Sequence, residues 1–163
     1  MNNQNRIYEV TDAHITFRNF TGEARQYNQA GNRNFNLILT PDMAETFADA
    51  GFRVRERKRR DPDDEQQFLM QVNVSYKFRA PRVVVIHGKK KTELNEDTIS
   101  ELDYADIEYI DLTIRPYHWA MPDGRAGIKA YLNSMYVTLA VDPFEDKYSD
   151  LDDDAADDEE EPF

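Results

Sequence analysis

The chain has 163 residues and a formal net charge of −12, with 32 acidic residues, 20 lysines and arginines and no cysteine. These numbers exclude a disulfide framework and a thiolate zinc site, and the length suits one hydrophobic core of ordinary domain size. No long apolar segment occurs, and no basic and then apolar start follows Met1. We therefore expect a soluble cytoplasmic protein without a membrane span.

The first half of the chain alternates apolar and polar residues with the period of β-strands. A loop rich in glycine, asparagine and glutamine is predicted over residues 21–32. Thr40 and Pro41 have the residue types of a helix N-cap and a first helical position, and Gly51 is typical of a helix end, so residues 42–50 are predicted to form a helix. The strands predicted in this half cover residues 7–10, 13–20 and 34–39.

The second half continues with strands and turns. Arginines recur at every second position from residue 53 to residue 59, which predicts a strand over residues 52–60 with one basic face. Residues 61–64 then have the composition of a turn. The other strands are predicted over residues 68–78, 82–87, 107–117 and 127–141, with a basic turn at 88–91, a helical turn at 95–102 and a tight turn at 121–124.

The negative charge is concentrated at the end of the chain. Residues 142–163 hold twelve acids and one base, whereas residues 1–141 hold twenty acids and nineteen bases. Like charges repel one another and apolar residues are few, so we expect a disordered acidic tail over residues 142–163 behind one folded domain over residues 1–141. The tail ends in Pro162 and Phe163, an apolar tip that suits the pocket of a partner protein.

The predicted elements are mostly strands with two short helical segments, which indicates an all-β fold with short helices. Because no βαβ alternation is present, we expect a small, closed or nearly closed antiparallel barrel of the OB type, with a compact β-sandwich as the alternative. The strand at residues 82–87 is expected to be an exposed edge that could pair protomers into a homo-oligomer. The aromatic residues expected in the core are Phe35, Phe47, Phe68 and Tyr136.

The basic residues of the domain gather in three segments, because residues 93–111 hold eight acids and no base. Six bases within residues 53–60 repel one another unless a polyanion neutralises them, although the acids at residues 61–65 could also pair with them. We predict that these segments bind nucleic acid. The predicted cations are Arg53, Arg55, Arg57, Lys58, Arg59, Arg60, Lys77, Arg79, Arg82, Lys89, Lys90 and Lys91.

Aromatic residues interleave with these cations along the strands. Single-stranded nucleic acid is bound by a cationic groove together with flat rings, on which bases stack at about 1–3 kcal/mol each. Tyr27 and Trp119 adjoin predicted loops or turns and are expected to be exposed, although such rings also anchor loops. The stacking residues predicted from the sequence are Tyr27, Tyr76, Phe78 and Trp119.

No residue pattern supports catalysis, so we expect a protein without enzymatic activity, cofactor or metal. The three histidines are widely separated, and neither a phosphate-binding glycine loop nor a nucleophile elbow occurs. Residues 150–161 have the acid spacing of a calcium loop, but Ala155 stands at the position that needs glycine.

A basic OB-type domain followed by an acidic tail that ends in Pro162 and Phe163 resembles the single-stranded DNA-binding proteins of bacteria and their phages. Residues 15–20, 31–35 and 127–131 are similar to segments of the phage members. One departure is that three glutamates precede Pro162, where bacterial members often have an apolar residue.

The resemblance implies a domain that coats and protects single-stranded DNA, and a tail that recruits replication or recombination proteins in the bacterial cytoplasm. In the absence of DNA the acids could also occupy the cationic groove. Two other hypotheses remain, an acidic DNA mimic that inhibits a nucleic-acid enzyme and an RNA-binding OB module. The tail residues implied in partner binding are Asp157, Asp158, Glu159, Glu160, Glu161, Pro162 and Phe163.

Overall fold

The structure is a computed structural model that describes residues 6–77, 79–141 and 144. Phe78 and the predicted partner-binding residues Asp157 to Phe163 lie outside the described residues. No helix in the described part of the chain is long and apolar enough to span a membrane.

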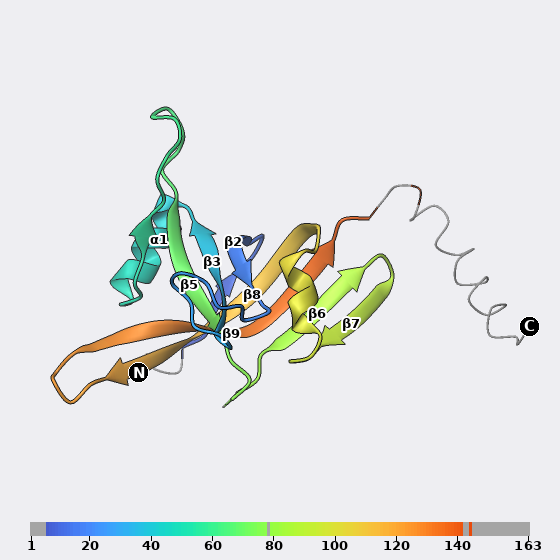
Figure 1. Ribbon diagram of the computed structural model, residues 1–163. Helices are drawn as coiled ribbons and strands as arrows, with labels where there is room; N and C mark the ends of the chain where they lie inside the picture. The colour runs from blue at the N-terminus through green and yellow to red at the C-terminus, as the bar shows by residue number, and fades with distance from the viewer. Residues whose placement is uncertain (1–5, 78, 142–143, 145–163) are drawn as a thin grey trace, which may run out of the picture.

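Residues 6–141, apart from Phe78, fold into strands with one α-helix and a short 3-10 helix (Figure 1). In chain order the elements are β1 (Tyr8–Val10), β2 (His14–Asn19), β3 (Arg33–Leu39), α1 (Pro41–Asp49), β4 (Arg55–Glu56), β5 (Phe68–Val74), β6 (Arg82–His87), β7 (Lys90–Leu94), η2 (Ile99–Asp103), β8 (Ile107–Ala120) and β9 (Ala126–Leu139).

The strands form one curved sheet whose neighbours follow the order β1-β8-β9-β5-β3-β2. β9 is the central strand. One edge pairs along its length with β8, and the other pairs in parallel first with β5, at Ala130 and Tyr131, and then with β6, from Ser134 to Thr138. The predicted all-β, OB-like class is confirmed, but the sheet is not closed and these two pairings are parallel.

The core lies inside the curve of the sheet, as strand periodicity requires. On β3, Phe35, Leu37 and Leu39 are fully buried and face the buried Val72 and Met70 of β5 across the sheet register. Phe20 stacks on Phe35 with ring centroids 5.3 Å apart. Alternate residues of the same strands point to the other face of the sheet, where polar side chains dominate.

The helix forms where its capping residues predict it. The Thr40 hydroxyl accepts a hydrogen bond from the Met43 backbone N–H, and Pro41 occupies the first turn. Gly51, with φ of +102°, then ends the helix in the left-handed region. The helix buries Phe47 against Tyr8 and Phe52, with ring centroids 5.6 and 5.5 Å away.

Two core predictions are confirmed and one is wrong. Phe35 and Phe47 are buried, and Phe68 is partly buried against the core. Tyr136 is 39% exposed, because the alternation of β9 turns its neighbours Met135 and Val137 inward. Pattern alone did not fix which of these adjacent residues faces the core.

The predicted basic strand over residues 52–60 is wrong, because only Arg55 and Glu56 pair with β5. Beyond Glu56 the chain has no apolar residues to bury a face, so residues 57–67 form a long loop, here named the β4–β5 loop. The predicted return strand also ends at Val74 instead of residue 78. Lys90 and Lys91, predicted in a turn, begin strand β7.

The predicted edge strand is wrong as well. β6 pairs with β7 on one side and with β9 on the other, so its backbone groups are occupied within the sheet. The parallel pairing arises because β9 is long enough to pass β5 and continue alongside β6. Strand pairing between protomers through residues 82–87 is therefore not available in this fold.

Candidate nucleic-acid interface

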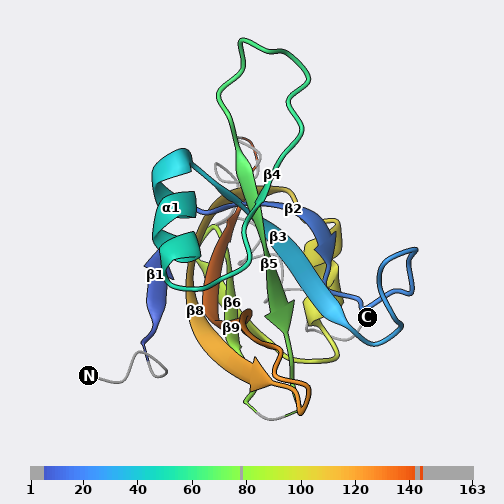
Figure 2. The same cartoon turned by 90° about the vertical axis from the view of Figure 1, so that its left-hand side faces the viewer.

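The β8–β9 hairpin extends from the sheet (Figure 1 and Figure 2). Its register places aromatic and basic residues on one of its faces. The register places Arg115 opposite Tyr131, Tyr117 opposite Lys129, and Trp119 opposite Gly127. Residues directly opposite in antiparallel strands project to the same side, so these side chains share a surface. We name this surface the aromatic face and define it as Arg115, Tyr117, Trp119, Lys129 and Tyr131.

The rings of the aromatic face contact one another in a fixed arrangement. The guanidinium carbon of Arg115 lies 5.1 Å from the centroid of the Tyr131 ring, which is cation–π distance. Tyr131 in turn meets Tyr117 edge to face, with centroids 5.7 Å apart and planes at 77°. Tyr117 is 50% exposed, so the outer ring of the series presents a large area to solvent.

Arg115 is held by packing instead of by polar bonds. Within the described part of the chain its buried Nε has no hydrogen-bond partner. Burial, reinforced by the nearby charge of Arg79, lowers the pKa of Arg115, while Tyr131 opposes the shift. A guanidinium remains charged despite such a shift. Two neighbouring arginines beside exposed aromatic rings suit the binding of a phosphate.

Polar side chains continue the same side of the sheet across β5 and β3. Asn73 is in register with Tyr131 and donates through Nδ2 to the Ala130 carbonyl at 3.2 Å, which ties β5 to the hairpin. Next to it along the register lie Asn34 and, farther along β3, Asn36. Arg55 donates to the Asn36 amide oxygen at 3.3 Å, which connects this surface to the base of the β4–β5 loop.

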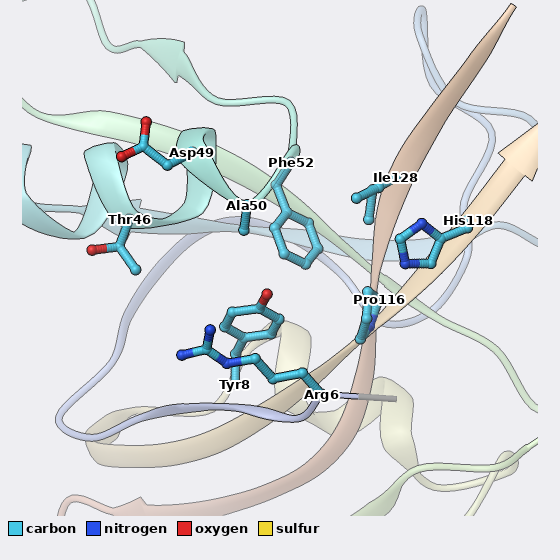
Figure 3. A pocket seen from close by; sticks show the side chains of 9 residues that line it. All are labelled: Arg6, Tyr8, Thr46, Asp49, Ala50, Phe52, Pro116, His118 and Ile128. Carbon is cyan, nitrogen blue, oxygen red and sulfur yellow. The ribbon is translucent and has the colours of Figure 1, made fainter. Parts of the chain in front are cut away.

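The opposite face of the hairpin packs toward the helix. Pro116, His118 and Ile128 line a shallow pocket there, together with residues of β1 and α1 (Figure 3). Phe52 forms a parallel bridge with Ile128 at this point. These contacts hold the hairpin at its base. Because the pocket is on the other side of β8 and β9, it is separate from the aromatic face.

The β4–β5 loop projects from the molecule in a different direction from the β8–β9 hairpin: in Figure 1 the loop points upward and the hairpin points to the left. Arg57, Lys58, Arg59 and Arg60 line a shallow depression on it with Asp64 and Glu65. Within the described residues none of these four bases forms an ion pair with an acid. The Arg59 guanidinium instead donates to the carbonyls of Pro62 and Asp64 at 3.3 and 3.4 Å.

The structure separates the basic residues that the sequence grouped together. Arg79 lies near Arg115 of the aromatic face, and Arg82 pairs in register with Ser134 of β9, three residues along the strand from Tyr131. Lys89, Lys90 and Lys91 belong to the β6–β7 hairpin, on the other side of the molecule from the tip of β8–β9 (Figure 1). The exposed Arg53 and Lys77 lie next to β4 and β5, respectively.

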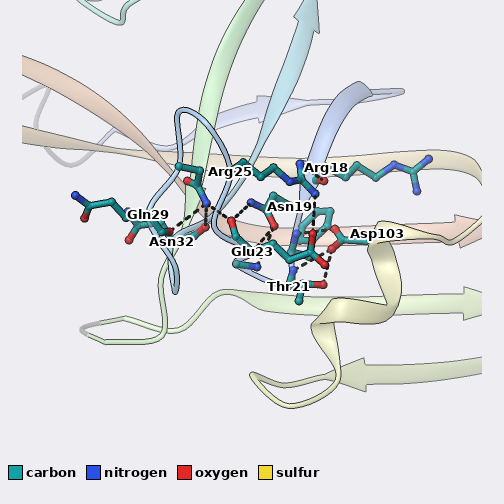
Figure 4. Close-up of polar contacts among 11 residues, drawn as sticks. Arg18, Asn19, Thr21, Glu23, Arg25, Gln29, Asn32 and Asp103 are labelled. Carbon is teal, nitrogen blue, oxygen red and sulfur yellow. Dashed lines mark hydrogen bonds and ion pairs between the residues drawn. The ribbon is translucent and has the colours of Figure 1, made fainter.

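Tyr27 is 93% exposed on a loop that hydrogen bonds hold in shape (Figure 4). The buried Asn19 amide oxygen accepts from the backbone N–H of Gly22 and Glu23 at 3.1 and 2.9 Å, and its amide nitrogen donates to the Glu23 carbonyl. Asn34 then donates to the Asn28 side chain at 2.9 Å. This bond brings the loop beside the polar surface of β3, so Tyr27 stands at its margin.

Tyr76 is not an exposed stacking ring. It lies partly buried beneath Arg33, whose guanidinium carbon is 5.6 Å from the ring centroid. Burial raises the pKa of Tyr76, with Arg33 opposing the shift and Glu96 adding to it. Its hydroxyl has no hydrogen-bond partner within the described residues. Arg33 also pairs with Glu96 at 3.6 Å, so this cluster covers one end of the core.

Trp119 lies just before the turn, as predicted, but it is less exposed than predicted. β8 continues to Ala120, so Trp119 lies within the strand and is partly buried. Sequence reasoning omitted Arg115, Tyr117, Lys129 and Tyr131 from the site. Their alternation along residues 115–119 and 127–131 was a usable signal, because two strands joined by the turn at residues 121–124 must place such residues on one face.

Comparison with known proteins shows the family of this chain. The sequence profile of the family described as "Putative phage ssDNA-binding domain" matches residues 1–162. No curated protein sequence matches the chain.

Two similar solved structures are the single-stranded DNA-binding protein from bacteriophage Enc34 with a C-terminal truncation, and the same phage protein in complex with ssDNA. The TM-scores are 0.52 and 0.53, and the identities are 15% and 14%. Each alignment covers 85% of this chain, with 88% and 89% of the other chain, respectively. At these identities the likeness shows the shared fold.

Proposed function

Because the chain belongs to the phage ssDNA-binding domain family, we propose that its aromatic face and the adjoining polar surface bind single-stranded DNA. The observation that supports this proposal most strongly is the series Arg115, Tyr131 and Tyr117, in which a guanidinium and two rings are in contact on a protruding hairpin. Rings that are already fixed lose little freedom when bases stack on them.

The spacing of the rings favours an unpaired strand. Tyr117 and Trp119 are two residues apart on one strand, so their positions differ by about 6.8 Å along β8. Successive bases in a duplex are about 3.4 Å apart along each strand. Two neighbouring bases that stack on the two rings must therefore separate from each other. A single strand permits this separation, whereas the base pairing of a duplex resists it.

The cations contribute in a different way from the rings. Arg79, Arg82 and Arg115 are placed to neutralise phosphates beside the stacked bases, and the β4–β5 loop offers four more bases without ion pairs among the described residues. Phosphate contacts carry no base identity, and their strength falls as salt rises. The proposed binding is thus tolerant of sequence and sensitive to ionic strength.

The wider role that we propose is to coat and protect single-stranded DNA during phage replication and recombination in the bacterial cytoplasm. The acidic tail, which ends in Pro162 and Phe163, would recruit replication or recombination proteins and could compete with DNA for the cations in its absence. This part of the proposal depends on the sequence alone.

Fluorescence anisotropy with labelled oligo-dT, duplex DNA and RNA, each at several salt concentrations, tests the proposal. We expect the full chain to bind the single strand at least about tenfold more tightly than the duplex, with quenching of Trp119, the sole tryptophan in the sequence. Absence of binding to every oligonucleotide at low salt would support the DNA-mimic hypothesis. Preference for RNA over the DNA of the same sequence would support an RNA-binding module.

A further inference from the structure

We propose that Gly127 is a positioning residue, which allows the Trp119 indole to lie against the backbone of β9 and so sets it as a stacking surface. This inference builds on the proposed DNA-binding function. Nothing in the residue type of Gly127 suggests a role, because glycine has no side chain to contact a ligand. The role follows from the absence of a Cβ atom, which leaves space for the Trp119 indole.

The space above Gly127 is occupied by the indole ring. A Cβ atom built on Gly127 would lie 2.8 Å from Cζ2 of Trp119 and 2.9 Å from both Cε2 and Nε1. The optimal separation of non-bonded carbon atoms is about 3.5–4.0 Å, so a methyl group on residue 127 cannot fit while the ring keeps its present position. The clash involves three adjacent ring atoms, so the indole must move to make room for a methyl group.

The backbone conformation gives no other reason for a glycine here. The chain has six glycines, all of them described, and five of them have φ between +63° and +102°. Gly127 is the sixth and lies in β9 in the ordinary strand region, which any residue adopts. Glycine weakens a strand through its conformational freedom, and within strands it often marks a close approach of another group. The approaching group is Trp119.

The geometry has a consequence for recognition. The indole rests with these atoms against the β9 backbone, on the same face of the hairpin as the half-exposed Tyr117. A ring supported from beneath keeps its orientation when no DNA is bound. A ring displaced by a methyl group would stand off the strand and lose its alignment with Tyr117, so a base that stacks on one ring could no longer be followed by a base on the other.

The decisive experiment is a double-mutant cycle with Gly127→Ala and Trp119→Ala in the full chain, measured by anisotropy with labelled oligo-dT. We expect Trp119→Ala to weaken binding by about 5–150-fold, the range for the loss of one stacked base. Gly127→Ala should reproduce a substantial part of that loss. In the Trp119→Ala background it should have no further effect, since the ring that it displaces is absent.

A second readout reports on positioning without DNA. In the free protein, Gly127→Ala should change the near-UV circular dichroism of the single tryptophan and increase its quenching by acrylamide. The matched control is Ala126→Ser, which adds one heavy atom at the exposed neighbouring residue on the other face of the hairpin and should change neither spectrum nor affinity. An unchanged tryptophan spectrum in Gly127→Ala would overturn the inference.

The two proposals fail in different ways. If Trp119→Ala binds oligo-dT as tightly as the parent, stacking on Trp119 is wrong, whereas the spectral result still decides the role of Gly127 in placing the ring. If Gly127→Ala lowers the melting temperature, adding Trp119→Ala should abolish that loss relative to Trp119→Ala alone, because the ring that clashes is then absent. Failure of this rescue would show that the methyl group disturbs the strand itself and would contradict the inference.

Discussion

The β8–β9 hairpin and the β4–β5 hairpin both project from the sheet, and both carry positive charge, but they are built differently. β8 and β9 have 14 residues each and stay in register nearly to their tip, whereas β4 and β5 share only two paired positions before residues 57–67 form a loop. The first hairpin therefore fixes rings in contact, and the second presents cations without rings.

This difference separates two kinds of binding energy. The proposed stacking on Tyr117, Trp119 and Tyr131 would depend on geometry and be little affected by salt. The proposed neutralisation of phosphates by Arg57, Lys58, Arg59 and Arg60 would depend on charge and weaken as ionic strength rises. Variants in the β8–β9 hairpin should therefore change the affinity for DNA without changing its salt dependence. Variants in the β4–β5 loop should change the salt dependence as well.

The largest effect is expected from removing the four bases of the β4–β5 loop together. R57A/K58A/R59A/R60A should lower the slope of log affinity against log salt by about 0.7 for each phosphate that the loop no longer neutralises, and should weaken binding by up to roughly 10²–10³-fold near 0.1 M salt. Anisotropy titrations with oligo-dT across salt concentrations measure both quantities.

The matched control for the loop variant is K90A/K91A in β7, which removes charge from the other side of the molecule. On an oligonucleotide too short to wrap around the domain, we expect this control to change the salt slope much less. Equal changes in slope for the two variants would show that the loop has no special role and that net charge alone governs binding.

A smaller effect is expected from Tyr117→Ala in the β8–β9 hairpin. The ring is half exposed, so its loss should leave the domain folded and cost about 1–3 kcal/mol of binding free energy, with the salt slope unchanged. The control is Tyr104→Ala, which removes an 86% exposed ring outside the aromatic face. A changed salt slope in Tyr117→Ala, or equal losses in both variants, would contradict the division between the two hairpins.

A third change tests the hydrogen bonds that hold the loop carrying Tyr27 in shape, outside both hairpins. Asn19→Ala leaves the backbone N–H groups of Gly22 and Glu23 without their acceptor, and should lower the free energy of unfolding by about 1–3 kcal/mol in urea titrations. Gln29→Ala, at an exposed position of the same loop, is the control and should have little effect. Unaltered stability in Asn19→Ala would mean that the loop does not need these bonds.

The smallest effect concerns Tyr76, which is outside both hairpins. Burial raises its pKa, so the folded state holds the phenolic proton more tightly than the unfolded state. The resulting stability is fully present below the unfolded pKa of about 10 and is lost as pH rises through the folded value.

Urea unfolding of Tyr76→Phe measures this contribution. Near pH 8 the variant should be as stable as the parent or slightly more stable, because the buried hydroxyl has no partner among the described residues. Above pH 10 the parent should lose stability relative to the variant. A parallel decline of both proteins with pH would contradict the assignment, and DNA binding should be equal in the two at pH 8.

Local rules allowed much of the fold to be predicted. The capping residues Thr40 and Pro41 marked the helix, and alternation marked β3 and β6. The burial tendency of aromatic residues failed at Tyr136, because packing of Met135 and Val137 into the core turns this ring outward. Alternation was also misleading over residues 52–60, where period-two arginines resemble a strand although no apolar partner exists to bury one.

The candidate site was predicted only in part for a similar reason. Charge is visible in the sequence, so the cations of the β4–β5 loop were found, whereas the contact of Arg115 with Tyr131 joins residues from two strands. Trp119 was identified as a ring beside a turn, but its partial burial was not predicted, because the continuation of β8 to Ala120 depends on its pairing with β9.

The sequence by itself determined the all-β composition of the domain, the helix ends and the division of charge, since these depend on each residue and its near neighbours along the chain. Only the tertiary structure decided which rings and cations meet. The reason is that β9 pairs with β8, β5 and β6 at once, and such pairings between distant segments are chosen by burial of the whole core and not by local preference.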